Sequence, residues 1–159
     1  MKKQLPVFGV GPVYVVPCCM ATLAGMLLCH AGYLKGGAIH APNLLAILLG
    51  VLLMGVEAAL WFHAVILQRI ASEIRQGALV TTGVYALVRN PIYSAFLLIL
   101  TGVLLCAHNL YLLLLPILYY AFLTLLMKHT EEKWLLERFG EPYAAYCKRV
   151  NRIIPWVRK

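Results

Sequence analysis

The chain is poor in charged residues. Only 13% of its side chains are Asp, Glu, Lys or Arg, against roughly 25% in soluble globular proteins. By contrast, 62% are hydrophobic and the mean hydropathy is +0.82. This balance excludes an ordinary soluble domain and predicts an integral membrane protein.

The sequence also lacks Cys-x-x-Cys pairs and any Cys/His spacing typical of metal ligands. Its five cysteines therefore favour structural thiols over redox or metal chemistry, and we expect no metal site. It has no internal repeat and no low-complexity linker, and its 159 residues fit one domain over 1–159.

Four apolar runs stand out, at about 11–32, 43–67, 91–107 and 110–128. A helix needs about 20 apolar residues to cross the hydrocarbon core, so the third run is barely long enough. Only "AHN" separates the last two runs, which predicts a tight antiparallel hairpin. We expect an all-α polytopic protein with about four transmembrane helices, joined by cytoplasmic interfacial and C-terminal helices.

Basic residues indicate the orientation of these helices. Lys2 and Lys3 resemble the start of a secretory signal, but the run that follows is too long and lacks a convincing cleavage site, so we expect a retained helix. Lys35 is the only basic residue of the first loop, whereas the second loop and the tail carry several. The positive-inside rule then places both termini, the 68–90 loop and the active site in the cytoplasm.

The formal net charge of +8 raises the question of a nucleic-acid partner. Because the basic residues gather beside the membrane ends, attraction to anionic lipid headgroups explains them more simply. We therefore expect membrane lipids, and no nucleic acid, as partners.

Two polar residues belong to the second apolar run. Glu57 lies deep in the run, where an ionised carboxylate is costly, so it is either a functional group or a neutral glutamate that joins two helices. His63 falls nearly opposite on the helix, so the two form no cluster, and a structural role is favoured for the histidine.

The stretch "GVYALVRNPIYS", residues 83–94, places polar side chains between two apolar runs. Residues 68–88, which lead into this stretch and overlap its start, form a weakly amphipathic segment that predicts an interfacial helix. Asn90 and Pro91 fit a helix start, with the asparagine as cap and the proline in the first turn. A helix start explains neither the two tyrosines, Tyr85 and Tyr93, nor Gly83.

The segment after the fourth run begins with Glu131 and Glu132. Read structurally, this pair is solvated and matched to nearby cations of its own helix; read functionally, it is a carboxylate site for a cationic ligand or ribose hydroxyls. Further on, Gly140 and Pro142 predict the end of one helix and the start of another. Apolar residues recur at helical intervals through both helices: Leu135, Phe139, Tyr143, Tyr146 and Val150.

Four features follow one another along the chain: the 83–93 motif, a hydrophobic hairpin, the glutamate pair and the segment "FGEPYAAYCKRVNRIIP". In this order they resemble the isoprenylcysteine carboxyl methyltransferase and phospholipid methyltransferase superfamily. These are integral membrane enzymes that use S-adenosylmethionine. The resemblance covers about residues 78–156, which would be the methyltransferase-like, cofactor-binding half. The first two apolar runs resemble the family only as generic helices.

The resemblance implies a cofactor pocket at the cytoplasmic face, with a lipophilic methyl acceptor entering from the bilayer. Cofactor-binding residues carried over in this way are Gly83, Tyr85, Arg89, Asn90, Pro91, Tyr93, Glu131 and Glu132. Arg89, Glu132 and Arg149 are the candidate catalytic residues. The family motif is usually Arg-His-Pro-x-Tyr-x-Gly, so Asn90 and Ala95 depart from it. No role that needs an imidazole is carried over, and Ala95 narrows the groove expected there.

The acceptor stays open between two chemistries. An isoprenylcysteine-like carboxylate is already ionised and needs a cation, for which Arg149 or Arg152 is available. A phosphoethanolamine amine must lose a proton, for which Glu57 or His129 is available. Carboxyl methylation ranks first because the tail resembles that branch more closely. A non-catalytic scaffold on the same fold and, more remotely, a transporter are the alternatives.

Overall fold

The computed structural model describes residues 9–39, 43–62 and 78–154. Within them the regular secondary structure is all helical, joined by turns and irregular segments that include two isolated bridges, Ala38 to Asn109 and Val88 to Asn151. The elements in chain order are α1 (Gly11–His30), η1 (Lys35–Gly37), α2 (Asn43–Phe62), η3 (Gly83–Ala86), α4 (Pro91–Cys106), η4 (Leu112–Leu114), α5 (Leu115–His129), α6 (Glu131–Phe139) and α7 (Glu141–Arg149). The all-α prediction is thus confirmed for the described residues.

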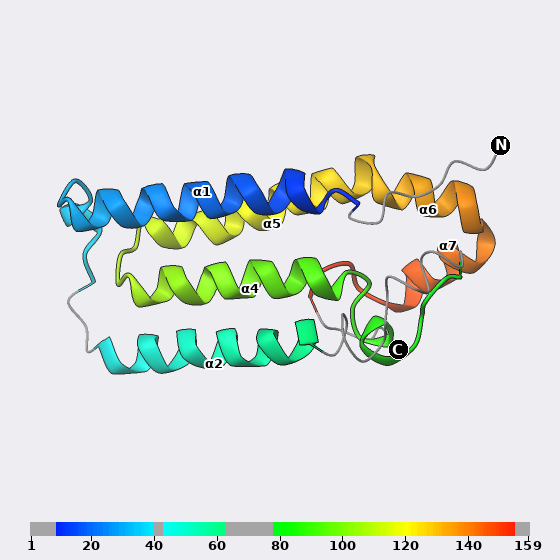
Figure 1. The fold of residues 1–159 in the computed structure, drawn as a ribbon, viewed down its shortest axis with the longest axis horizontal. Helices are drawn as coiled ribbons and strands as arrows, with labels where there is room; N and C mark the ends of the chain where they lie inside the picture. Colours follow the sequence, from blue (N-terminus) through cyan, green and yellow to red (C-terminus); the bar gives the residue numbers. More distant parts are fainter. Residues whose placement is uncertain (1–8, 40–42, 63–77, 155–159) are drawn as a thin grey trace.

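Four long helices run side by side along the long axis of the molecule (Figure 1). Helix α4 lies in the middle, with α2 on one side and the pair α1 and α5 on the other. Helices α6 and α7 and the short turn η3 gather at the end where α4 begins and α5 finishes. This end carries the polar motifs, whereas the opposite end carries the turn between α4 and α5.

Each predicted apolar run corresponds to one of these helices, although residues 63–67 of the second run lie outside the described residues. Two helical segments, Gly11–His30 and Leu112–Phe139, are long and apolar enough to cross a membrane. The apolar stretches Leu44–Val56 and Pro91–Cys106 are shorter. About half of the predicted interfacial segment, residues 68–77, also lies outside the described part, and residues 83–86 form a 3-10 turn instead of a longer helix.

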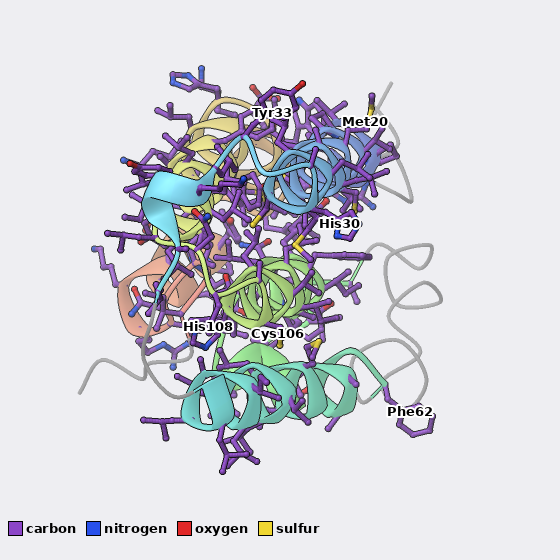
Figure 2. All side chains as sticks on the ribbon, turned by 90° about the vertical axis from the view of Figure 1, so that its left-hand side faces the viewer. Met20, His30, Tyr33, Phe62, Cys106 and His108 are labelled. Atoms are coloured by element: carbon purple, nitrogen blue, oxygen red, sulfur yellow. The ribbon has the colours of Figure 1, made fainter. Side chains whose placement is uncertain are left out.

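The predicted tight hairpin between α4 and α5 is confirmed, and a buried asparagine holds it. Asn109, only 1% exposed, donates from Nδ2 to the Leu34 carbonyl (2.8 Å) and accepts from the Tyr111 amide at Oδ1 (3.0 Å). Both ends of this buried side-chain amide are hydrogen-bonded, as buried polar groups normally are. Asn109 therefore fixes the turn against the end of α1. Viewed from this end, His108 and Cys106 lie between α4 and α2 (Figure 2).

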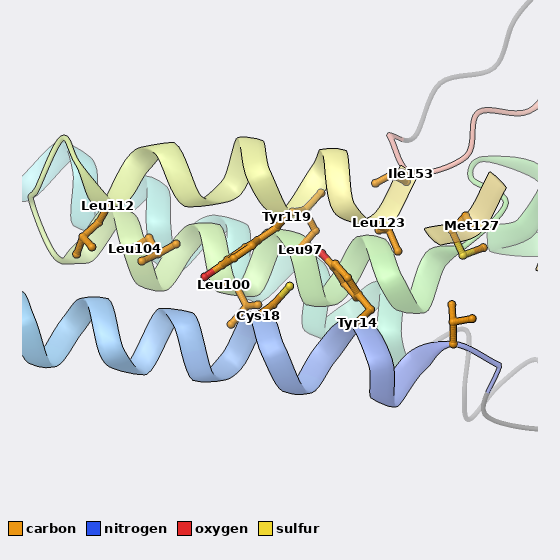
Figure 3. Close-up of a cluster of buried hydrophobic side chains, with 11 residues drawn as sticks. Tyr14, Cys18, Leu97, Leu100, Leu104, Leu112, Tyr119, Leu123, Met127 and Ile153 are labelled. Atoms are coloured by element: carbon orange, nitrogen blue, oxygen red, sulfur yellow. The ribbon is translucent and has the colours of Figure 1, made fainter. Parts of the chain in front are cut away.

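The main core lies between α1, α4 and α5 (Figure 3). Its fully buried members include Tyr14, Leu104, Leu123 and Met127. The Tyr14 ring meets Tyr93 edge to face, with centroids 6.2 Å apart, an arrangement that aromatic pairs prefer. This contact joins the core directly to the polar end of the bundle.

Helices α2 and α4 cross at a pair of glycines. A Cβ atom built on Gly102 would lie 2.7 Å from the Gly50 carbonyl oxygen, and the reverse distance is the same. Small residues let helix backbones approach this closely in membrane proteins. The α2–α4 contact is therefore set by backbone packing.

The outer faces of three helices are apolar and exposed. The exposed side chains include Val13, Val16, Met20 and Leu23 on α1, Leu44, Leu45, Leu48 and Leu52 on α2, and Ile117, Leu118 and Leu125 on α5. Apolar patches this large are unusual on soluble monomers. They indicate a surface that faces lipid.

Candidate active site

The polar motifs meet at one end of the bundle. The loop before α4 brings Arg89, the start of α6 brings Glu132, and the chain after α7 brings Arg152. Arg89 Nη1 lies 3.2 Å from Glu132 Oε1. Arg152 binds the same carboxylate with two parallel hydrogen bonds, Nε to Oε1 (2.5 Å) and Nη2 to Oε2 (2.8 Å). Two cations thus share one carboxylate.

This cluster lies past the end of α5, which supplies the apolar part of the segment Leu112–Phe139. The apolar segment Leu112–Phe139 has 28 residues, about 42 Å as a helix, whereas the hydrocarbon core is about 30 Å thick. Helix α5 ends at His129, and α6 starts anew at Glu131. The segment is thus longer than the core is thick, and the two glutamates lie after the break that ends α5.

Burial alone would raise the pKa of Glu132, but hydrogen bonds from Arg152 and the charges of Arg89, Arg152 and Lys128 lower it below its ordinary value. The same hydrogen bonds raise the pKa of Arg152. Charge-assisted bidentate pairs of this kind are among the stronger polar contacts in proteins. Glu132 is consequently held ionised and in one orientation.

Glu131 has different partners. Its Oε1 accepts from the Tyr93 hydroxyl (2.6 Å) and from the backbone amide of Val10 (2.7 Å), at the start of α1. Burial, only partly offset by these two hydrogen bonds, raises the pKa of Glu131. The two neighbouring carboxyls therefore have pKa values shifted in opposite directions, a pattern common in functional sites.

These contacts replace the local ion pairs that were one reading of the sequence. Because successive helical residues point about 100° apart, the sequence predicts that only one of the two glutamates faces inward. In fact both are half-buried and face different neighbours. Glu131 contacts α1 and α4, and Glu132 contacts the two arginines.

Arg89 is the most buried cation of the cluster, with its side chain 8% exposed. Nη1 contacts Glu132 and the Cys147 thiol, but Nε is buried and has no hydrogen-bond partner among the described residues. A buried guanidinium N–H normally finds an acceptor. This one is an unsatisfied donor within the described part of the structure.

Asn90 does not cap α4 with its side chain as predicted, although α4 does begin at Pro91. The side-chain amide instead donates to the Arg152 carbonyl (3.0 Å). Ser94, fully buried, bonds the Asn90 and Ile153 carbonyls. The asparagine thus joins the start of α4 to the tail of the chain.

Gly83 and Tyr85 lie in η3, at the edge of the site. Gly83 has φ +60°, which a glycine adopts without strain. The Tyr85 carbonyl accepts from the buried Tyr146 hydroxyl of α7 (2.6 Å). The predicted apolar pattern through α6 and α7 is confirmed, since its members form one cluster: Leu135, Phe139, Tyr143, Tyr146 and Val150.

Arg149 is exposed at the last position of α7, and the structure brings Arg152 into the cluster instead. In the sequence, Arg152 was only an alternative cation for the acceptor, because no local pattern links it to Glu132. His129 is exposed. His63 and the side chain of Glu57 lie outside the described part of the structure.

The sequence model of one family, phospholipid methyltransferase, matches residues 44–142, more than half of the chain. This protein belongs to the phospholipid methyltransferase family. The membership confirms the superfamily inferred from the motifs. No curated protein and no solved structure matches the chain.

The matched region holds the 83–93 motif and both glutamates, but it differs in extent from the resemblance read in residues 78–156. It begins in α2, which the motifs left as a generic helix. It ends at Pro142, before the buried face of α7 and before Arg152. Family membership and the apolar helices together indicate a membrane methyltransferase.

Proposed function

We propose that this protein transfers a methyl group from S-adenosylmethionine to a lipophilic acceptor at the membrane boundary. One observation carries the proposal: Arg89 pairs with Glu132, and Tyr93 bonds Glu131, at the same end of an apolar helix bundle. These residues come from the two motifs that the resemblance assigns to the cofactor.

The charges of the cluster fit the polar groups of this cofactor. Its methionine part carries a carboxylate and an ammonium group, and its ribose carries hydroxyls. The unpartnered Nε of Arg89 suits the carboxylate. The two glutamates suit the ammonium group and the hydroxyls. Tyr85, Tyr93, Phe139 and Tyr143 would line the adenine side.

S-adenosylmethionine supplies an electrophilic methyl group on a sulfonium. Its transfer is an in-line displacement that needs alignment and exclusion of water more than a covalent nucleophile. A rigid cluster held by bidentate bonds on a packed bundle meets the need for alignment. Arg89 and Glu132 would then orient the donor.

We further propose four transmembrane helices, with the site on the cytoplasmic side. The segments at the site end of the bundle carry several basic residues: Arg89, Lys133, Arg138, Lys148 and Arg152. By contrast, Lys35 follows α1 at the other end (Figure 1). This asymmetry supports the orientation derived from the positive-inside rule.

For the acceptor, the first candidate is the carboxylate of an isoprenylcysteine-like lipid. The site end carries an excess of positive charge, which would attract an anionic acceptor from the membrane surface. Arg152 is engaged by Glu132. Of the two arginines that the sequence offers for the acceptor carboxylate, the exposed Arg149 is therefore the one that remains.

The second candidate is the amine of a phosphoethanolamine lipid. Its ammonium form must lose a proton before its nitrogen attacks the methyl carbon and the carbon–sulfur bond breaks. Glu131, a buried carboxyl with a raised pKa, is suited to accept that proton. This single observation favours the amine.

The first test is calorimetric binding of S-adenosylhomocysteine to the detergent-purified protein. We expect micromolar binding that weakens in Arg89→Gln and Glu132→Gln, with both variants folded by circular dichroism. A folded wild-type protein that does not bind would refute the methyltransferase proposal and favour a non-catalytic scaffold.

The second test identifies the acceptor by the stability of the product. Radioactive methyl transfer is measured from S-adenosylmethionine to a farnesylcysteine analogue or to phosphatidylethanolamine vesicles. A methyl ester releases labelled methanol in mild base, whereas an N-methyl group does not. Label that is stable to base would overturn the carboxyl assignment.

A further inference from the structure

Arg152 lies outside the region that matches the family, yet it has the closest contacts in the cluster. It occupies both oxygens of Glu132, whereas Arg89 reaches only Oε1, at 3.2 Å. Two guanidinium groups and one carboxylate leave one positive charge in excess. The geometry assigns that excess to Arg89, whose Nε has no partner among the described residues.

The chain around Arg152 is held in place by the family motif itself. The Arg89 amide donates to the Asn151 carbonyl (2.8 Å), the Asn90 side chain to the Arg152 carbonyl (3.0 Å), and Ser94 to the Ile153 carbonyl. Ile153 is 3% exposed and packs into the main core. Three consecutive carbonyls thus dock on the start of α4.

We propose that Arg152, carried by the segment Asn151–Ile153, is a positioning residue that holds Glu132 away from full pairing with Arg89 and so keeps Arg89 able to bind the carboxylate of the cofactor. The inference rests on the proposed function. It gives the C-terminal segment, and Asn90 in place of a motif histidine, a specific task in ligand recognition.

The physical reason is competition for one carboxylate. Without Arg152, Arg89 would be the arginine left to Glu132, beside the charge of Lys128, and a bidentate pair between Arg89 and Glu132 would become the favourable arrangement. The Arg89 guanidinium would then be neutralised by the protein itself. A ligand carboxylate would lose its partner, while an uncharged part of the ligand would be unaffected.

The test compares two ligands by calorimetry: S-adenosylhomocysteine and its decarboxylated analogue. We expect the wild-type protein to prefer the carboxylate form by about tenfold to a hundredfold, the range for a hydrogen-bonded charge. Arg152→Gln should lose most of this preference, because it binds the carboxylate form more weakly and the analogue almost unchanged. Arg138→Gln, an exposed arginine on α6 that lies over the Phe139 ring, is the control and should keep the preference.

A second variant separates positioning from mere stabilisation. Adding Glu132→Gln to Arg152→Gln removes the group that neutralises Arg89, so the preference for the carboxylate form should return. If Arg152→Gln fails to fold, Arg152→Lys takes its place and should show a reduced preference, since an ammonium cannot hold both carboxylate oxygens.

The outcomes separate the two proposals. Equal weakening of both ligands in the single variant, or an unchanged preference, would overturn the positioning role. A wild-type protein that binds both ligands equally would overturn it too, but would leave the methyltransferase proposal intact. Binding of neither ligand would overturn both.

Discussion

Tyr93 on α4 donates its hydroxyl hydrogen to Glu131 on α6 across 2.6 Å, and the same carboxyl oxygen accepts the amide of Val10. One side chain thereby joins the starts of three helices.

Replacing Tyr93 with Phe should destabilise the protein by about 1–3 kcal/mol, because a buried carboxyl oxygen loses one of its two donors. The measurement is the midpoint of thermal unfolding in detergent. Tyr33→Phe is the control, since Tyr33 is 79% exposed and its hydroxyl is open to water. Equal midpoints for the two variants would contradict a structural role for the Tyr93 hydrogen bond.

The two glutamates should affect stability with opposite dependence on pH. The folded-state pKa of Glu131 is raised, so its contribution is full below the unfolded pKa and is lost as pH rises through the folded pKa. The pKa of Glu132 is lowered, so its contribution is present above the unfolded pKa and is lost as pH falls through the folded value.

At neutral pH, Glu131→Gln should therefore cost little stability or even raise it, whereas Glu132→Gln should lower it. The two variants should converge with the wild type toward acid pH from opposite sides. Unfolding midpoints measured from pH 4 to pH 8 check this. Parallel curves for the two variants would show that the environments of the glutamates are alike.

Gly9→Ala should destabilise the start of α1, and the effect should depend on Glu131. Gly9 has φ +49°, and a Cβ atom there would lie 1.9 Å from Glu131 Oε1. The added methyl group forces the carboxyl out of its hydrogen bonds. In a Glu131→Ala background we expect the cost of Gly9→Ala to fall by about 0.5–3 kcal/mol, the usual range for residues in contact.

Gly140→Ala is the matched control for that cycle. Gly140 also has positive φ, +57°, but its Cβ position has no neighbouring atom within 4 Å among the described residues. Backbone strain is therefore present without a clash. The cost of Gly140→Ala should therefore be the same with and without Glu131→Ala. If Glu131→Ala lowers the cost of both glycine substitutions alike, backbone strain alone explains the cost at Gly9.

Gly102→Ala should loosen the contact between α2 and α4. The new methyl group would meet the Gly50 carbonyl at 2.7 Å and Met54 Cγ at 2.9 Å, so the helices must separate at a cost of about 1–3 kcal/mol. Gly55→Ala, on the same helix as Gly50, meets nothing within 4 Å in the part of the chain that the structure describes and should be neutral or slightly stabilising. Unfolding midpoints of the two variants provide the comparison.

Much of the fold was predictable because a membrane helix must be apolar over its whole length. The four runs, the short "AHN" connection and the break at Gly140 depend on local composition, and the structure reproduces each in its described part. The motif around Arg89 and the glutamate pair could likewise be selected from the sequence, because polar side chains between apolar runs are rare.

The partners of those side chains were not predictable. Local spacing suggested a cap for Asn90 and nearby cations for Glu132, yet Asn90 bonds the Arg152 carbonyl and Glu132 pairs with Arg89 and Arg152. In the sequence, Arg149 was the candidate catalytic residue and Arg152 only the alternative cation. The direction in which the chain leaves α7, and not the residue type, brings one of them into the cluster.

The sequence by itself therefore determined the class of the protein, the positions of its helices and the family to which it belongs, because each depends on composition or on short motifs. Only the tertiary structure decided that Glu131 holds the start of α1 while Glu132 is bound by the C-terminal segment. The physical reason is that Glu131 and Val10 are 121 positions apart in the chain, and Glu132 and Arg152 are 20 apart. Hydrogen bonds depend on distances in space, and the packing of the helices sets those distances.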